Sequence, residues 1–374
     1  MIPLNEHLLP LQRSGIRKYT NLAKTVPGCV MLTIGEPDFP TPEPIKAAAV
    51  AALTANRTHY APNQGVEALR QEIANYETKR GMDCNSEQVL ITAGATGALF
   101  TALLGILNPG DEVVIPTPAF SLYETITTVA GGIPVAYDLK KTDFQITPQA
   151  LSQVITPKTK AIILNSPHNP TGTVLSKSSL RAVKQAVLGK SIFVICDNVY
   201  DRLSAPVHDL TLDRELRGQC LLCQSFSKPY AMTGWRIGYL VGPEDMMQRL
   251  LLLHAAEVAS IPTFLQDACI TALSVSPKEM ADAYGRRRES ICNRLTRMGL
   301  SYPKPEGAFY VFPDISGYGL SDEEFCTRMI QEAKVAAVPG SCFGCPGHIR
   351  ISYCCADTAL QAGLDRLEQF LQSL

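Results

Sequence analysis

The chain has 374 residues, more than one compact core usually holds, so a large and a smaller domain are expected. Its 34 Lys and Arg residues nearly balance its 35 Asp and Glu residues, and no basic face or charge run is visible, which argues against nucleic acid or anionic membranes as partners. Because the N-terminus lacks a secretion signal and no apolar run reaches the roughly 18 residues of a membrane span, a soluble cytoplasmic protein is expected.

The N-terminal segment, residues 1–40, carries turn signals around 14–17 and 34–40 and is expected to be irregular. Helices are predicted from Glu43 to Leu53 and from Val66 to Arg80, with a turn between them.

From residue 88 onward, apolar runs of strand length alternate with amphipathic stretches of helix length. This alternation predicts an α/β fold with a mostly parallel sheet of about seven strands, flanked by helices. A long helical stretch from Glu244 through Gly299 closes the sheet domain. The expected strands are Gln88 to Thr92, Glu112 to Ile115, Pro134 to Leu139, Ala161 to Leu164, Ile192 to Cys196, Leu221 to Cys223 and Ile237 to Val241, and helices are expected at Thr96 to Leu107, Leu122 to Ala130 and Ser178 to Leu188.

The remaining segment, from 302 to 374, alternates differently and predicts a smaller α+β domain. Its strands are expected at 308–312, 335–338 and 349–353, followed by a helix from Thr358. We therefore divide the chain into an N-terminal arm over 1–40 that joins the small domain, a large domain over 41–285 and a C-terminal small domain over 286–374.

One lysine, Lys228, stands on a turn between two predicted strands. Ser225 and Ser227 lie just before it, and Arg236 follows eight positions later. A lysine flanked by phosphate donors suits covalent capture of an aldehyde-bearing, phosphorylated cofactor. This stretch alone is equally consistent with an ordinary loop lysine and an arginine paired with a carboxylate.

In open α/β sheets, ligands bind outside the carboxyl ends of the strands, so partners of a functional Lys228 should also follow strands. Ala95 and Thr96 open a helix whose free N–H groups suit a phosphate. Phe120 offers a ring that could stack on a planar cofactor, and Asn169 can donate to a phenolate oxygen. Taken singly, each has a structural explanation, since small residues begin many helices and a Phe is more often a core residue.

Two charged residues follow or occupy later apolar runs. Asp197 ends such a run, and a buried carboxylate needs a cationic partner, which a protonated ring nitrogen would supply. Tyr200, three residues on, could reach the same cofactor's oxygen. Arg350 is flanked by apolar strand residues and suits a substrate carboxylate, although a structural ion pair is an equal alternative.

The cysteine pairs at 220 and 223 and at 342 and 345 imitate the spacing of a zinc framework. The first pair lies in a predicted strand, where residues i and i+3 point to opposite faces and cannot share one metal ion. No metal site is therefore expected.

With these residues assembled, the chain resembles a class I/II aminotransferase of the fold-type I pyridoxal 5'-phosphate (PLP) enzymes over nearly its whole length. The motifs that carry the resemblance are, in chain order, Gly-Glu-Pro-Asp-Phe, Tyr-Ala-Pro-Asn-Gln-Gly, Gly-Ala-Thr-Gly-Ala-Leu, Ser-Pro-His-Asn-Pro-Thr-Gly, Ser-Phe-Ser-Lys, Gly-Trp-Arg-Ile-Gly-Tyr, Gly-Ala-Phe-Tyr, and Val-Pro-Gly before Arg-Ile-Ser.

The resemblance implies a fold-type I PLP-transferase and a role for each of these residues. Lys228 would form an aldimine with PLP, and Asp197 would keep the pyridine nitrogen protonated. Arg350 would bind the substrate α-carboxylate, helped by Asn169 and the Gly35 backbone. The other implied cofactor ligands are Asn169 and Tyr200 at the ring oxygen, Phe120 on the ring face, Ala95, Thr96, Ser225, Ser227 and Arg236 at the phosphate, and Tyr60 from the neighbouring subunit of a homodimer.

The implied activity moves an amino group from an L-amino acid to a 2-oxo acid by a ping-pong mechanism. Several motifs are most similar to the branch with N-acetyl-L,L-diaminopimelate and aromatic amino acid aminotransferases. Thr96 stands where an aspartate-specific branch carries a lysine, which argues against aspartate specificity. Ile16, Tyr19 and Tyr123 are hypothetical neighbours of the substrate side chain. A PLP-dependent C–S β-lyase and a PLP-binding domain of a transcription regulator are the alternatives.

Overall fold

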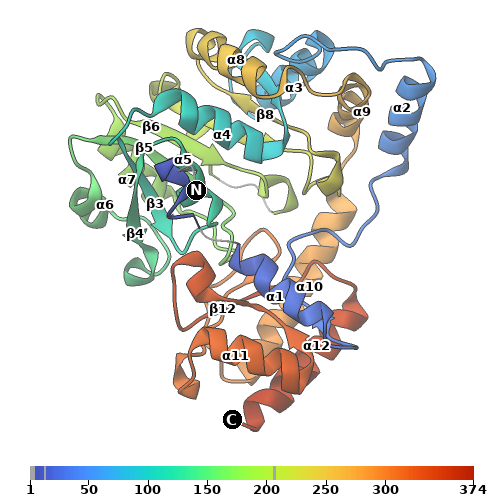
Figure 1. Ribbon diagram of the computed structural model, residues 1–374, viewed down its shortest axis with the longest axis vertical. Coiled ribbons are helices and arrows are strands. Elements are labelled where there is room, and N and C mark those ends of the chain that lie inside the picture. Colours follow the sequence, from blue (N-terminus) through green and yellow to red (C-terminus); the bar gives the residue numbers. More distant parts are fainter. Residues whose placement is uncertain (1–4, 12–13, 205–207) are drawn as a thin grey trace.

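The main sheet of the computed structural model has seven strands in the order β2-β8-β7-β6-β5-β3-β4 (Figure 1). The structure describes residues 5–11, 14–204 and 208–374. Within this sheet β8 runs antiparallel to its neighbours β2 and β7, and the other paired strands are parallel. The predicted sheet of about seven mostly parallel strands is confirmed. Its strands are β2 (Val89–Thr92), β3 (Glu112–Thr117), β4 (Ile133–Asp138), β5 (Thr159–Asn165), β6 (Phe193–Asp197), β7 (Cys220–Ser225) and β8 (Gly238–Val241).

Helices cover both faces of the sheet, which is why its strands are nearly continuous apolar runs. Along β5, Ala161 and Ile163 join a core with α4, α5 and α8, whereas Ile162 and Leu164 join the opposite core with α6 and α7. A third cluster packs α2, α3 and α9 against β2 and β8. These helices are α2 (Glu43–Thr54), α3 (Glu67–Lys79), α4 (Gly94–Ile106), α5 (Leu122–Val129), α6 (Pro148–Val154), α7 (Lys177–Val187), α8 (Glu244–Val258) and α9 (Thr263–Ser274).

The helical stretch expected from Glu244 to Gly299 is divided into three helices, α8, α9 and α10 (Lys278–Arg297). Pro262 and Pro277 stand immediately before α9 and α10. Proline lacks a backbone N–H and disfavours a helical conformation in the preceding residue, so these prolines prevent one helix from continuing directly into the next.

A helix, α1 (Gly15–Lys24), occupies part of the N-terminal segment that was expected to be irregular. Its buried residues include Tyr19 and Ala23, which pack into a core formed mainly by the C-terminal part of the chain. The Ser-Gly pair at its start resembles a turn signal. The glycine is needed for close packing instead, because a Cβ atom at Gly15 would lie 2.3 Å from the Sγ of Cys342.

The C-terminal part of the chain forms a second body beside the main sheet (Figure 1). It contains a three-stranded antiparallel sheet, β11-β12-β9, and a parallel pair of β10 with β1 from the N-terminal segment. The single strand expected at 335–338 is thus two short strands with different partners. The elements of this body are β1 (Val30–Met31), β9 (Tyr310–Val311), α11 (Asp322–Arg328), β10 (Val335–Ala336), β11 (Val338–Pro339), β12 (Ile349–Ser352) and α12 (Asp357–Gln372).

Helix α10 connects the two bodies, and its buried residues Met280 and Tyr284 already belong to the core of the second body. The helix therefore runs across the domain boundary expected near residue 285. The division into an arm over 1–40, a large domain over 41–285 and a small domain over 286–374 stays a prediction.

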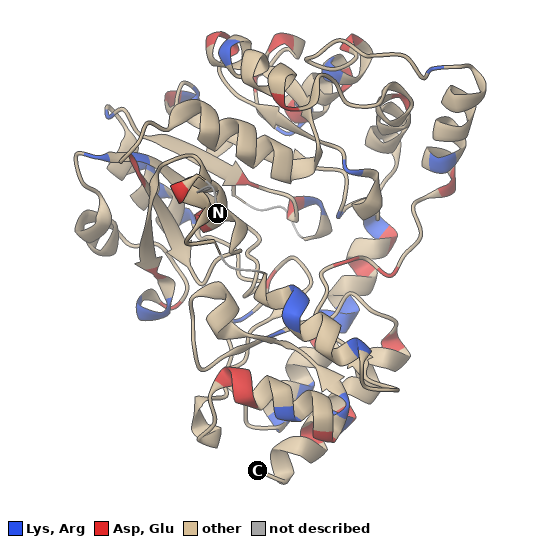
Figure 2. Cartoon of the chain, in the orientation of Figure 1, with Lys and Arg blue, Asp and Glu red and all other residues tan. Residues whose placement is uncertain are grey.

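Lys and Arg residues are interspersed with Asp and Glu over both bodies (Figure 2). In the part of the chain that the structure describes, no helix is long and apolar enough to cross a membrane. Among the same residues, no three His, Cys, Asp or Glu side chains are placed to hold one metal ion.

Candidate active site

A cavity of about 420 Å³ lies at the carboxyl ends of β5, β6 and β7, where the main sheet meets the second body. Its lining comes from segments far apart in the sequence. All the predicted site residues line it except Tyr60, whose side chain is 93% exposed in the single chain. The predicted residues in the lining are Gly35, Ala95, Thr96, Phe120, Asn169, Asp197, Tyr200, Ser225, Ser227, Lys228, Arg236 and Arg350.

Lys228 reaches the cavity from the turn that follows β7. Phe226 and Tyr230, on either side of it, are buried in the core beneath the sheet and fix this turn. The Nζ atom of Lys228 donates a hydrogen bond to the carbonyl oxygen of Gly35 at 2.6 Å. Burial lowers the pKa of Lys228 to about 8, so a neutral amine is accessible near physiological pH.

Asp197 is the last residue of β6, and its carboxylate is buried at the floor of the cavity. The Tyr123 hydroxyl donates to its Oδ2 at 2.6 Å, and the Val199 N–H donates to its Oδ1 at 3.4 Å. No described Lys, Arg or His forms an ion pair with it. Burial raises the pKa of Asp197 to about 6, although these two hydrogen bonds and the charge of Lys228 oppose the shift.

Donors suited to a phosphate gather where α4 begins beside β7 and β8. The N–H of Ser227 donates to the Oγ of Ser225 at 3.0 Å, which fixes the two serines relative to each other. Arg236 has a left-handed backbone, with φ of 52°, and its Nη1 donates to the Thr233 carbonyl at 2.8 Å. A Cβ atom at Gly94 would lie 2.9 Å from Arg236 Nη2, so this glycine keeps the start of α4 close to the guanidinium.

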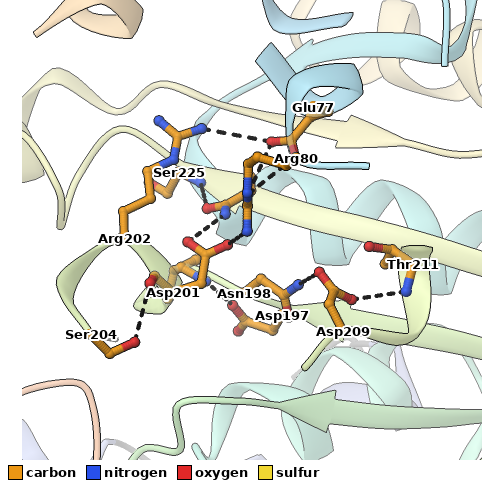
Figure 3. A network of polar contacts seen from close by, with 12 residues as sticks. Glu77, Arg80, Asp197, Asn198, Asp201, Arg202, Ser204, Asp209, Thr211 and Ser225 are labelled. Carbon is orange, nitrogen blue, oxygen red and sulfur yellow. Dashed lines mark hydrogen bonds and ion pairs between the residues drawn. The ribbon is translucent and has the colours of Figure 1, made fainter. Parts of the chain in front are cut away.

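Ser225 belongs to a network of polar contacts that also contains Glu77, Arg80 and Asp201 (Figure 3). The Ser225 N–H donates to the Oε1 of Gln224 at 3.1 Å, and the Nε2 of Gln224 donates to Asp201 at 2.9 Å. Asp201 pairs with Arg80, which also pairs with Glu77 at 3.1 Å. The network therefore joins the end of β7 to helix α3 and to the loop after β6.

Arg350, in β12, is 2% exposed and is held from several sides. Its Nη1 donates to the Oδ1 of Asn169 at 2.9 Å, and its Nη2 donates to the carbonyl of Thr33. The rings of Tyr310 and Phe343 lie 4.5 Å and 4.9 Å from the guanidinium carbon. Its Nε has no hydrogen-bond partner among the described residues. The side-chain oxygen of Asn169 accepts this hydrogen bond from Arg350, so its Nδ2 remains available as a donor.

Tyr310 is a site residue to which the sequence analysis gave no role. It lines the cavity, and its hydroxyl lies 3.0 Å from that of Tyr200. A Cβ atom at Gly35 would lie 1.8 Å from the Tyr310 hydroxyl oxygen, so a glycine is required there. The Gly-Ala-Phe-Tyr motif marked this region, but nothing in the sequence indicated which atoms the tyrosine contacts.

The three hypothetical neighbours of the substrate side chain have different positions. Ile16 lines the cavity, as does the adjacent Arg17. Tyr19 does not line it and is buried in the core of the second body, so this hypothesis was wrong. Tyr123 lines the cavity too, but its hydroxyl is bound to Asp197.

Comparison with known proteins identifies the family. A family model described as aminotransferase class I and II matches residues 27–367. The chain belongs to this family. A probable N-acetyl-LL-diaminopimelate aminotransferase of Bacillus subtilis (strain 168) is 38% identical to this aminotransferase. The match covers 98% of the present chain and 96% of the relative. The aromatic-amino-acid aminotransferase 2 of Thermococcus litoralis is 37% identical over 99% and 98% of the two chains.

Solved structures agree with this aminotransferase in fold. The aspartate aminotransferase from Thermus thermophilus with maleate superposes with a TM-score of 0.93 at 34% identity, covering 99% of this chain and 100% of that chain. The predicted fold-type I class and the enzyme class are therefore confirmed.

Class I and II aminotransferases are PLP-dependent, and the cavity of this one fits the cofactor. The lining includes a buried carboxylate, Asp197, that forms no ion pair with a described residue, as a site for a protonated pyridine nitrogen requires. Lys228 lines the same cavity, and Arg236 lies beside the first residues of α4, where a phosphate would be bound. These groups are complementary in charge to the ring and the phosphate of PLP.

Proposed function

We propose that this aminotransferase moves an amino group from an L-amino acid to a 2-oxo acid in two half-reactions with ping-pong kinetics. The observation that carries the proposal is that one cavity is lined by Lys228, whose pKa is lowered to about 8, and by Asp197, a buried carboxylate that forms no ion pair with a described residue. The lysine suits a base, and the aspartate suits a cationic ring.

Bound PLP supplies an aldehyde that captures an amine and a ring that accepts the electrons released at the substrate Cα. Asp197 would hold the ring nitrogen through a charge-assisted hydrogen bond. The Tyr200 hydroxyl and the Nδ2 of Asn169 would donate to the ring oxygen, and Phe120 would lie against the ring face. The residues proposed for the phosphate are Ala95, Thr96, Ser225, Ser227 and Arg236.

Lys228 would hold the cofactor aldehyde before substrate arrives and act as the base afterwards. As a neutral amine, its Nζ takes up the proton that leaves the substrate Cα and holds it as an ammonium until it is returned. Burial supports this role because it disfavours the charged form, and the nearby Arg236 and Arg350 act in the same direction.

Arg350 would bind the α-carboxylate of the substrate by two parallel hydrogen bonds. Its burial and its contacts with Asn169 and Thr33 hold the guanidinium in one place. The Gly35 backbone would assist from the opposite wall. The donors that we propose are N-acetyl-L,L-diaminopimelate, aromatic amino acids or a broader range of amino acids, because the relatives that carry these names match nearly the whole chain.

The working form is proposed to be a cytoplasmic homodimer with shared active sites. The exposed ring of Tyr60 supports this assembly, because a tyrosine that is 93% exposed in one chain is available to a second one. Its hydroxyl would donate to the cofactor phosphate of the neighbouring subunit.

The test is a half-reaction followed by absorption. The purified protein is loaded with PLP and mixed with single amino acids in the absence of any 2-oxo acid. We expect stoichiometric conversion to pyridoxamine phosphate and release of the matching 2-oxo acid, and we expect Lys228→Ala to lose the conversion by more than about a thousandfold. Release of ammonia and a thiol from cysteine or cystathionine, without pyridoxamine phosphate, would establish the lyase instead.

A further inference from the structure

The cavity has one more cation in its lining than the proposed reaction uses. Its charged residues are Asp197 and four cations, Lys228, Arg236, Arg350 and Arg17. The ring, the phosphate and the substrate α-carboxylate account for the first four of these residues. Arg17 has no function in the transfer, and the inference drawn from it rests on the proposed function.

Arg17 stands in the first turn of α1, and its side chain is exposed at the cavity. It forms no ion pair and no side-chain hydrogen bond with any described residue. The adjacent Lys18 differs on both points, because it pairs with Glu323 at 3.4 Å and does not line the cavity. The structure thus leaves an exposed guanidinium in the cavity lining without an ion pair to a described residue.

The position of α1 is fixed relative to the proposed α-carboxylate site. The Thr20 hydroxyl, on α1, donates to the Thr33 hydroxyl at 2.9 Å, and the Thr33 carbonyl accepts a hydrogen bond from Arg350. At the start of the helix, Gly15 is packed against Cys342. Thr33 therefore links the helix that carries Arg17 to Arg350, and both arginines line the same cavity.

Among the described residues that line the cavity, the one anion is Asp197, which is assigned to the ring nitrogen. Several of the other lining residues are apolar, and Thr96 on α4 is neutral. An arginine without a partner, beside apolar surface, is suited to a carboxylate at the end of a partly apolar side chain. The apolar residues of the lining include Ile16, Ile34, Leu99, Phe120 and Leu122.

We propose that Arg17 binds a second carboxylate, at the end of the substrate side chain, and that the preferred substrates are amino acids whose side chains end in an acid. Arg350 then selects the α-carboxylate and Arg17 the distal one. Amino acids with neutral side chains still bind against the apolar lining, but without the contribution of Arg17.

The experiment compares two acid–amide pairs of donors, in which the members have nearly the same shape and differ in one charge, together with a longer acid and a neutral aromatic donor. The kcat/KM of the half-reaction is measured with PLP-loaded enzyme for L-glutamate against L-glutamine, L-aspartate against L-asparagine, and L-2-aminoadipate and L-phenylalanine. We expect the wild type to prefer each acid to its amide. Arg17→Met should lower kcat/KM for the preferred acid by about 10- to 100-fold, mainly through KM, and change it for the neutral donors by less than about twofold.

Two further variants keep the test specific. Arg17→Lys retains the charge but not the forked guanidinium, and it should recover part of the preference. Lys18→Met removes the same charge from the same helix turn outside the cavity, and it should leave the preference unchanged. The proposal would be overturned if Arg17→Met lowered kcat/KM equally for acids and amides, or if the wild type preferred the amides. It would also be overturned if Lys18→Met lowered kcat/KM selectively for the acids, or if Arg17→Met dissociated the enzyme.

The outcome for the proposed function is read separately. If neutral donors are converted while Arg17→Met changes nothing, the role of Arg17 is wrong and the aminotransferase reaction stands. If the wild type converts none of these donors, nor any other amino acid tried, both proposals fail.

Discussion

At the scale of single residues, the buried carboxylate of Asp197 lowers the stability of the cofactor-free fold. The same carboxylate is available to the cationic ring nitrogen of the cofactor. Folding raises the pKa of the Asp197 carboxyl from 3.8 to about 6, because the group is buried with hydrogen bonds but without an ion pair among the described residues. Above pH 6 the carboxyl of Asp197 is ionised in both states, and its charge has a higher free energy in the native protein than in the unfolded chain. The resulting destabilisation is absent below about pH 4 and develops as the pH rises to 6.

Replacing this carboxylate by an amide should stabilise the cofactor-free protein while abolishing its function. We expect Asp197→Asn to raise the free energy of unfolding at pH 7 by about 1–3 kcal/mol, since two pKa units correspond to about 2.7 kcal/mol and some hydrogen bonding is lost. The difference in stability is measured from the urea midpoints of the two proteins at pH 7 and at pH 4. The gain in free energy of unfolding should vanish at pH 4. The half-reaction should slow by at least about a hundredfold.

Asp209 provides the matched control, because burial also raises its pKa to about 6 and it does not line the cavity. Asp209→Asn should change stability with the same pH dependence and leave the half-reaction intact. An Asp197→Asn variant that is less stable than the wild type at pH 7 would contradict this account.

At the scale of elements, the end of β7 depends on a side chain that never enters the cavity. Gln224 is fully buried and joins Ser225 to Asp201. Gln224→Leu removes the side-chain acceptor of the Ser225 N–H and one donor to Asp201, which keeps its ion pair with Arg80, so Ser225 should lose its fixed position. We expect the Kd for PLP, measured by fluorescence titration of the cofactor-free protein, to rise by about 10- to 100-fold.

The same substitution can be made at the other end of the strand. Gln219 precedes β7 and donates to the carbonyls of Val187, Lys190 and Ile192. Gln219→Leu should lower stability but leave the Kd for PLP within about twofold. Equal effects of the two substitutions on the Kd would mean that Gln224 acts through general stability alone.

Elements and site residues differ in how far the sequence could predict them. The seven strands, and the polar residues that follow them, could be predicted because alternation and apolar runs are local signals. Helix α1 could not, since the packing of Gly15 against Cys342 joins residues that are distant in sequence. The contacts of Tyr310 with Tyr200 and of Tyr123 with Asp197 depend on the same kind of long-range arrangement.

At the scale of the whole molecule, the exposure of Tyr60 makes a prediction about assembly. If Tyr60 acts on the neighbouring subunit, Lys228→Ala and Tyr60→Ala chains should each have low activity, yet a mixed dimer would contain one site with both residues intact. Mixing the two variants after dissociation should therefore restore activity, up to about a quarter of the wild-type level for random pairing.

Sedimentation should give twice the 40.6 kDa mass of one chain for both variants. Mixtures of each variant with itself are the controls and should stay at their low activity. A mixed sample that is no more active than the average of its parts would show that Tyr60 serves its own chain or has no role.

The cavity takes Gly35 from near the start of the chain and Arg350 from near its end. During synthesis, β6, which ends at Asp197, and β7, which precedes Lys228, are complete well before β12 is made, whereas β1 must wait for β10 before it can pair. The cofactor side of the site can therefore form while the chain is still growing, but the carboxylate-binding side forms only in the finished polypeptide. A nascent chain interrupted before β12 has the lysine and lacks the arginine, so it cannot place a substrate for transfer.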